Sequence, residues 1–188
     1  SMSGTKIIQA RDASKFIVNN LNDGDKFNIV DFSDAASNFR SQHVAYTNNS
    51  RDSALAYINS FQALGGTNIS GAFSLAVPQF STANDSTANI IIFFTDGQPT
   101  VGITNTTQLL SHVHTLIQSN ESNIFLYCFG IGTDVNVQLL TLMGSQNSGL
   151  AEFLGNDELY SRITDFYLRI RNPVLLSPTI SFSGNTVS

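Results

Sequence analysis

The apolar run at residues 90–94 constrains the fold of this chain more than any other segment. It reads Ile-Ile-Ile-Phe-Phe, and Gly97 and Pro99 close it. Such a short run of β-branched and aromatic residues indicates a strand that is buried on both faces. Asp96 follows at the carboxyl end of that strand, the edge where open α/β sheets bind ligands. Asp96 is therefore a candidate ligand-binding residue, although Asp-Gly is also a common turn pair.

Helical and strand-like patterns alternate along the rest of the chain. Apolar residues recur at helical spacing in six segments, which predicts helices at 6–21, 51–61, 68–80, 105–120, 136–145 and 159–170. Strands are predicted at 26–32, 90–94, 123–130 and 151–154, with an extended piece at 38–40 as a hairpin partner of the first. This alternation predicts an α/β fold with a doubly wound, mostly parallel central sheet that helices flank on both faces.

A chain of 188 residues fits one domain, which we assign to residues 1–171, with 172–188 as the start of a following extended segment.

The predicted elements lack one strand that a fold of this kind requires. The first predicted helix precedes the first predicted strand, so the first, central strand of the sheet is missing from the given chain. A sheet without its middle strand exposes two unpaired edges. We therefore expect that residues beyond this sequence, or another strand, fill the gap.

Composition excludes several classes of protein. The net charge is −5 and Lys and Arg form no cluster, which argues against a nucleic-acid partner. No apolar stretch approaches the roughly 20 residues that span a bilayer, and no signal peptide is evident. Cys128 is the single cysteine and lies in an apolar run, so it is predicted to be a small buried hydrophobe. One cysteine builds neither a disulfide framework nor a cysteine-based zinc site.

The Asn-x-Ser/Thr pattern occurs five times. In a chain this rich in Asn, Ser and Thr, about that many matches arise by chance, so they do not establish secretion. The five asparagines are Asn48, Asn68, Asn84, Asn105 and Asn120.

Three short segments are candidates to meet at one edge of the sheet. They are residues 1–4 before the first helix, 65–67 before the third, and 95–97 after the apolar strand. Hydroxyl and carboxylate oxygens are hard ligands that suit Mg²⁺, Mn²⁺ or Ca²⁺. A site with few carboxylates leaves the ion with positive charge that can attract an acidic group of a partner. Each Ser or Thr near a helix start is also open to the simpler interpretation of a helix N-cap.

Four stretches together resemble the von Willebrand factor type A domain, in the form found in inter-alpha-trypsin inhibitor heavy chains. They read K-I-I-Q-A-R-D-A from Lys6, G-D-K-F-N-I-V-D-F from Gly24, L-G-G-T-N-I from Leu64, and I-I-F-F-T-D-G-Q-P-T from Ile91. The resemblance covers residues 1–171, and the T-D-G-x-P stretch after an apolar strand is specific. The tail from Pro173 resembles the first strands of the region that follows this domain in that group.

The resemblance implies a metal-ion-dependent adhesion site. Its ligands would be Thr67, Asp96 and Ser1, the last of which matches the final serine of the family's Asp-x-Ser-x-Ser loop. The Asp and the earlier serine of that loop would precede residue 1, and Ser3 would not be a ligand. Mg²⁺ is the cation implied first, with Mn²⁺ and Ca²⁺ as alternatives. The family also implies a protein partner with an exposed Asp or Glu, and extracellular or cell-surface placement.

The remaining candidates have simpler interpretations. Asp31 and Asp34 bracket the end of the predicted strand 26–32 and are expected to be solvated loop residues. We predict no functional role for the histidines and a core role for three aromatic residues, while segments 97–105 and 132–136 are expected to rim the site. The histidines are His43, His112 and His114, and the aromatic residues are Phe61, Phe73 and Phe80.

Three classes of function follow. The first is a binding module that captures an acidic side chain of a partner protein through a divalent cation, and is not an enzyme. The second is a metal-dependent hydrolase or phosphotransferase, which needs a general base near a metal-bound water. No His lies in the candidate loops and no phosphate-binding Gly-x4-Gly-Lys-Ser/Thr loop is present, so the second class is disfavoured. The third is a structural domain of this family that binds no metal.

Overall fold

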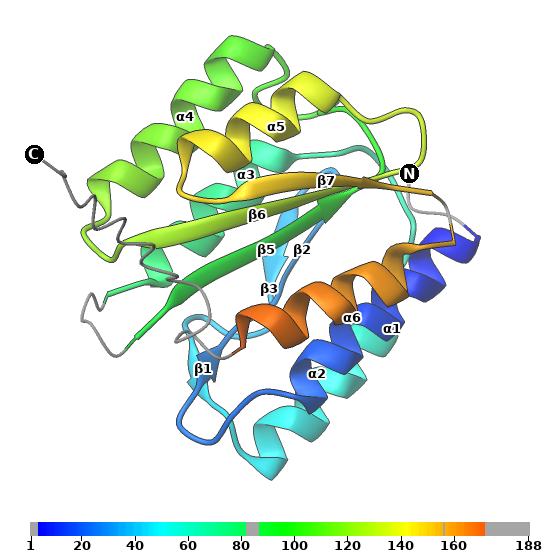
Figure 1. Ribbon diagram of the computed structural model, residues 1–188, viewed down its shortest axis with the longest axis vertical. Helices are drawn as coiled ribbons and strands as arrows, with labels where there is room; N and C mark the ends of the chain where they lie inside the picture. The colour runs from blue at the N-terminus through cyan, green and yellow to red at the C-terminus, as the bar shows by residue number, and fades with distance from the viewer. Residues whose placement is uncertain (1–3, 82–86, 156, 172–188) are drawn as a thin grey trace, which may run out of the picture.

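The computed structural model describes residues 4–81, 87–155 and 157–171 (Figure 1). The predicted ligand Ser1 and the predicted segment 172–188 lie outside these residues. The described elements, in chain order, are α1 (Thr5–Asn19), β1 (Lys26–Phe27), β2 (Val30–Phe32), β3 (Ala36–Asn38), β4 (Val44–Ala45), α2 (Asn48–Asn59), α3 (Ile69–Ala76), the 3₁₀ turn η1 (Val77–Gln79), β5 (Asn89–Thr95), α4 (Thr106–Ser119), β6 (Ile124–Ile131), α5 (Val137–Gln146), β7 (Leu150–Leu154) and α6 (Leu159–Ile170).

The strands β5, β6 and β7 form a parallel sheet in that order. Helices α3, α4 and α5 cover one of its faces, and α1 and α6 cover the other (Figure 1). Each face has its own apolar cluster: Leu126 and Cys128 of β6 point to the first, and Tyr127 and Phe129 to the second. This alternation explains why β6 is buried along nearly its whole length. The predicted α/β fold, with a parallel sheet between two helical layers, is confirmed.

The predicted strand at 26–32 is wrong in one respect, because two short strands take its place. β1 pairs antiparallel with β4, which the sequence did not reveal, and β2 pairs antiparallel with β3. Asn28 lies between them, and its Oδ1 accepts hydrogen bonds from the backbone N–H groups of Ile29 and Arg40. Local side-chain bonds of this kind compete with a continuous strand ladder. The expected hairpin partner at 38–40 exists, but it is β3, two residues earlier.

Polar caps define where the helices begin. Thr47 caps α2 through a capping box with Ser50, so that helix starts at Asn48 rather than at the predicted residue 51. Asn68, Asn105 and Asn136 cap α3, α4 and α5 by accepting from the backbone N–H three residues later. The predicted helix 68–80 ends at Ala76 and continues as the η1 turn that contains Pro78. The last helix has the predicted bounds.

A cavity of about 930 Å³ lies between β5 on one side and β1 and β2 on the other. Ala10 and Ile17 of α1 line one wall, and Ala72 and Phe73 of α3 line another. Among the described strands, β5 pairs only with β6, and β2 pairs only with β3. The cavity is therefore where a missing central strand is expected, with apolar walls toward both helical layers. That a further strand fills it stays a prediction.

Candidate functional site

Asp96 lies directly after β5 and is almost completely buried, with 3% of its surface exposed. A carboxylate in such a position needs a partner. The ammonium nitrogen Nζ of Lys6, in the first turn of α1, lies 3.5 Å from Asp96 Oδ2. Two segments far apart in the sequence thus meet at the carboxyl end of β5 and place a positive charge on this carboxylate.

Thr67 precedes α3 and is also nearly buried, with 4% of its surface exposed. Its loop is joined to the loop that follows Asp96. The N–H of Thr67 donates to Thr100 Oγ1 over 2.8 Å, and the N–H groups of Thr100 and Val101 donate to the carbonyl of Thr67 over 3.0 and 3.3 Å. The predicted ligands Thr67 and Asp96 therefore belong to adjoining loops.

The loop before Thr67 allows close backbone approach. A Cβ on Gly66 would lie 2.7 Å from Thr100 Oγ1 and 2.8 Å from Asp34 Oδ1, so any larger residue requires these side chains to move. The N–H of Gly66 donates to that same Asp34 oxygen over 2.6 Å. Asp34 is exposed, as expected for a loop residue, yet it orients the Thr67 loop. The sequence does not reveal this contact of Asp34, because the two residues are more than thirty positions apart.

A second layer of hydrogen bonds supports the same loops. Ser70 Oγ accepts from the N–H of Ile103 over 3.0 Å, and Ser70 is buried. Gly102 adopts a positive φ of 72°, and a Cβ there would lie 2.4 Å from Ser70 Oγ. The predicted rim segment 97–105 is thus held against the start of α3.

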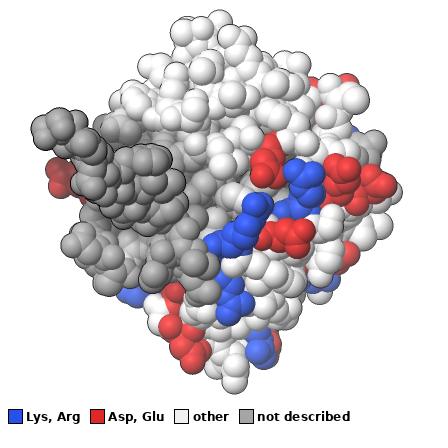
Figure 2. Space-filling view, in the orientation of Figure 1, with Lys and Arg blue, Asp and Glu red and all other residues white. Residues whose placement is uncertain are grey.

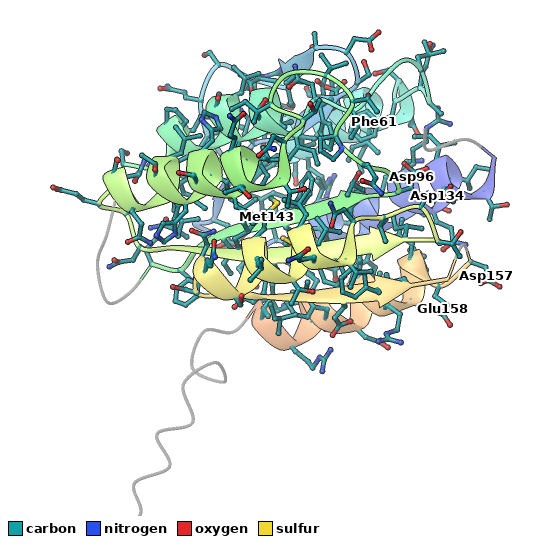
Figure 3. All side chains as sticks on the ribbon, turned by 90° about the horizontal axis from the view of Figure 1, so that it is seen from above. Phe61, Asp96, Asp134, Met143, Asp157 and Glu158 are labelled. Carbon is teal, nitrogen blue, oxygen red and sulfur yellow. The ribbon has the colours of Figure 1, made fainter. Side chains whose placement is uncertain are left out.

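Acidic side chains gather at this edge of the sheet. Figure 3 places Asp96, Asp134, Asp157 and Glu158 at the same end of the molecule, beyond the carboxyl ends of β5, β6 and β7. Asp134 is exposed and lies in the predicted rim segment 132–136, but it is not among the predicted ligands. A concentration of negative charge raises the local concentration of cations. The signal available in the sequence was an acidic residue shortly after each of three predicted strands.

The oxygen ligands at this edge of the sheet suit a hard cation but make up only part of a coordination shell. Thr67 supplies a buried hydroxyl and Asp96 a buried carboxylate that already attracts one positive charge, the ammonium of Lys6. Among residues 4–81, 87–155 and 157–171, no cluster of three or more His, Cys, Asp or Glu is arranged to hold a metal ion. A full coordination shell therefore needs further oxygen ligands, from water or from residues outside the described ones.

The other candidates have local roles. His112 Nε2 lies 3.1 Å from Ser74 Oγ, and His114 Nδ1 lies 3.1 Å from Asn147 Oδ1, so these histidines join neighbouring helices. His43 packs edge-on against Phe80, and burial, with the nearby charge of Lys26, lowers its pKa. None of the three lies in the loops that carry Thr67 and Asp96.

Two further polar groups are structural. The hydroxyl of Tyr57 donates to Asp31, which lies in β2 rather than in an open loop, and burial and this bond raise the pKa of Tyr57. Cys128 is fully buried, as predicted, and burial raises the pKa of its thiol to about 12.

Of the three aromatic residues predicted to be core, Phe73 is buried, and Phe61 and Phe80 are partly buried.

Charge is distributed unevenly over the surface. Helices α4 and α5 contain no Asp, Glu, Lys or Arg. Figure 2 shows few charged residues over the upper part of the molecule. Acidic and basic residues intermingle over α1 and α6 instead. None of the described helices combines the length and the apolar content that crossing a bilayer requires.

Comparison with protein families gives one match. The family model described as von Willebrand factor type A domain matches residues 1–153. Among curated proteins, the chain is 36% identical, over an alignment of 194 positions, to inter alpha-trypsin inhibitor heavy chain 4 of Mus musculus, and 31% identical, over 195 positions, to heavy chain H2 of the same species. Each alignment covers all of this chain but 20% of the relative, so the chain spans about a fifth of their length.

Solved structures share the fold. A von Willebrand factor type A protein from Catenulispora acidiphila superposes with a TM-score of 0.75 at 24% identity, over 88% of this chain and 38% of that one. Proximal thread matrix protein 1 of the mussel byssus, with a zinc-occupied MIDAS motif, superposes with a TM-score of 0.63 at 18% identity, over 87% and 40%. At these identities the likeness concerns the fold.

Proposed function

Because this chain belongs to the von Willebrand factor type A domain family, we propose that it is a protein-binding module that captures an acidic side chain through a divalent cation. One observation carries this proposal: the buried hydroxyl residue Thr67 and the buried carboxylate Asp96 lie on hydrogen-bonded, adjoining loops at the ligand-binding edge of the sheet. The zinc-occupied MIDAS motif of the mussel byssus protein, which has the same fold, supports a divalent cation here.

We assign Thr67 and Asp96 to the cation, together with Ser1, which lies outside the described residues. When bound, the cation supplies a positive charge with open coordination positions. Mg²⁺ is the first choice, with Mn²⁺ and Ca²⁺ as alternatives, because all three prefer oxygen ligands. The first central strand and the remaining acidic ligand of the loop are proposed to come from residues that precede Ser1.

Because this edge of the sheet is itself acidic, we expect an acidic partner group to bind there only when the cation is bound. Asp34, which is hydrogen-bonded to Gly66, and the edge residues Asp96 and Asp134 would repel a carboxylate that approaches on its own. A bound divalent ion reverses that local charge and leaves room for a carboxylate ligand. Binding of the partner should therefore depend strictly on the cation. Extracellular or cell-surface placement is proposed from the heavy-chain relatives.

Calorimetric titration tests the proposal. We expect Mg²⁺ or Mn²⁺ to bind the full-length wild-type protein with one-site behaviour, and expect a chelator to abolish capture of a glutamate-containing ligand peptide. Absence of heat with Mg²⁺, Mn²⁺ and Ca²⁺ would instead favour a structural domain that binds no metal.

The alternative function is a metal-dependent hydrolase. The general base of such a hydrolase would have to be an acidic side chain at the carboxyl edge of the sheet, because the three histidines lie elsewhere. Turnover of ester and phosphate substrate panels decides between the two functions. Metal-dependent turnover that Asp96→Ala removes would overturn the binding module.

A further inference from the structure

The five Asn-x-Ser/Thr motifs are not equivalent in the folded chain. An N-linked glycan occupies the side-chain nitrogen Nδ2 of its asparagine and is bulky, so the residue must face solvent. The carbonyl oxygen Oδ1 stays free to accept a hydrogen bond. A motif can therefore carry a glycan only if its asparagine is exposed and the Nδ2 group of that asparagine makes no hydrogen bond that the fold needs. Asn84 lies outside the described residues.

Asn68 and Asn120 have their Nδ2 groups committed to the fold. Asn120 Nδ2 donates to the carbonyls of Val77 over 2.9 Å and Phe80 over 3.0 Å, so both of its N–H groups are used. Asn68 Nδ2 donates to the carbonyl of Asp34 over 3.2 Å. Both asparagines are only partly exposed. A sugar on either nitrogen would break these bonds and force neighbouring segments apart.

Asn48 and Asn105 are compatible with a glycan. Asn48 is exposed at the first position of α2, and Thr47 and Ser50 already supply the cap of that helix. Asn105 is exposed and caps α4 through Oδ1, which accepts from the N–H of Gln108 over 3.0 Å. Its Nδ2 makes no hydrogen bond to the described residues, so a sugar there leaves the cap intact.

We propose that Asn48 and Asn105 are N-glycan acceptors and that Asn68 and Asn120 are not. The donor is an oligosaccharide linked to a lipid pyrophosphate. A bond forms between Nδ2 and the anomeric carbon of the first sugar, the bond from that carbon to the pyrophosphate oxygen breaks, the lipid pyrophosphate leaves, and Nδ2 loses one proton. The inference rests on the extracellular placement proposed above, since the transfer takes place in the secretory pathway.

The two acceptors lie differently with respect to the candidate ion site. Asn48 follows β4, which pairs with β1, and Figure 1 draws β1 at the lower left, away from the carboxyl ends of β5, β6 and β7 at the right. Asn105 ends the rim segment that is hydrogen-bonded to the Thr67 loop. A glycan on Asn105 would limit the size of partners that reach the ion site, whereas one on Asn48 would not.

The test is to secrete the full-length protein from cultured animal cells behind a heterologous leader, in an Asn84→Gln background that removes the fifth motif of residues 1–188. Glycan occupancy is measured by mass spectrometry of peptides before and after endoglycosidase treatment. We expect glycans at Asn48 and Asn105, and none at Asn68 or Asn120. Asn48→Gln and Thr107→Ala should each remove one glycan; the second keeps the Asn105 cap. Asn49→Gln, which preserves the Asn48 motif, should remove none.

Secreted or lumenal protein that is unmodified at both Asn48 and Asn105, or modified at Asn68 or Asn120, overturns the proposal. Because the leader imposes entry into the secretory pathway, a missing glycan reports on the asparagines and not on natural placement. Mg²⁺ titration of the enzymatically deglycosylated protein tests the proposed function separately.

Discussion

Thr67 and Thr100 hold each other through reciprocal hydrogen bonds. The N–H of Thr67 donates to Thr100 Oγ1 over 2.8 Å, and the N–H of Thr100 donates to the Thr67 carbonyl over 3.0 Å. The pair fixes the loop before α3 against the loop after β5. The Thr67 hydroxyl therefore sits on a rigid backbone, which lowers the entropy cost of binding an ion there.

Gly66→Ala is expected to destabilise the fold by about 1–3 kcal/mol, as overpacking commonly does. The added Cβ would lie within 2.8 Å of side-chain atoms of Thr100, Val101 and Asp34, so these side chains must move and the contacts between the two loops are disturbed. The free energy of unfolding is measured with urea. Gly155→Ala is the matched control, because a Cβ there would make contacts of 3.5 Å or longer. Equal effects at both positions would contradict the packing argument.

Thr67→Ala and Asp96→Asn are expected to abolish Mg²⁺ binding in calorimetry while the protein stays folded by circular dichroism. Thr67→Ala removes the hydroxyl ligand together with one methyl group, and Asp96→Asn removes the negative charge at nearly constant side-chain volume. Asp157→Asn is the control, since that exposed carboxylate lies at the same end of the molecule but outside the two loops. Mg²⁺ binding that survives both site variants would remove these residues from the ligand set.

Lys6→Met is expected to tighten Mg²⁺ binding by roughly twofold to fivefold, corresponding to the ~0.4–1 kcal/mol of a partly exposed ion pair. The ammonium of Lys6 lies 3.5 Å from Asp96 Oδ2 and competes with an arriving cation. Without Mg²⁺ the same variant should melt at a lower temperature, because Asp96 loses this positive charge. Lys15→Met on the same helix should change neither quantity. Weaker Mg²⁺ binding in Lys6→Met would mean that Lys6 assists the ion.

Cys128 is expected to resist thiol reagents in the folded protein at pH 8 and to react fully in denaturant. Burial raises the pKa of its thiol from 9.0 to about 12, so the reactive thiolate is nearly absent. The unfolded chain releases this proton at lower pH, so its contribution to stability is complete below pH 9 and is lost between pH 9 and about 12. Urea melts across that range should show a smaller decline for Cys128→Ala than for wild type.

The sequence by itself determined the order of the layers and most of the elements. The apolar period of α6 and the uninterrupted apolar run of β5 depend on local spacing, and both appear where predicted. Asp96 was recognisable because a carboxylate directly after a buried strand has a restricted set of explanations. Thr67 was recognised through family resemblance, since a threonine before a helix is more commonly a cap.

Only the tertiary structure decided which distant groups meet. The contacts of Lys6 with Asp96, Asp34 with Gly66 and Thr67 with Thr100 join residues 90, 32 and 33 positions apart, and no local pattern encodes such distances. The break between β1 and β2 was likewise hidden, because the side chain of Asn28 bonds to Arg40 across a hairpin. Local periodicity follows from backbone geometry, whereas pairing between loops follows from how the packed layers bring their ends together.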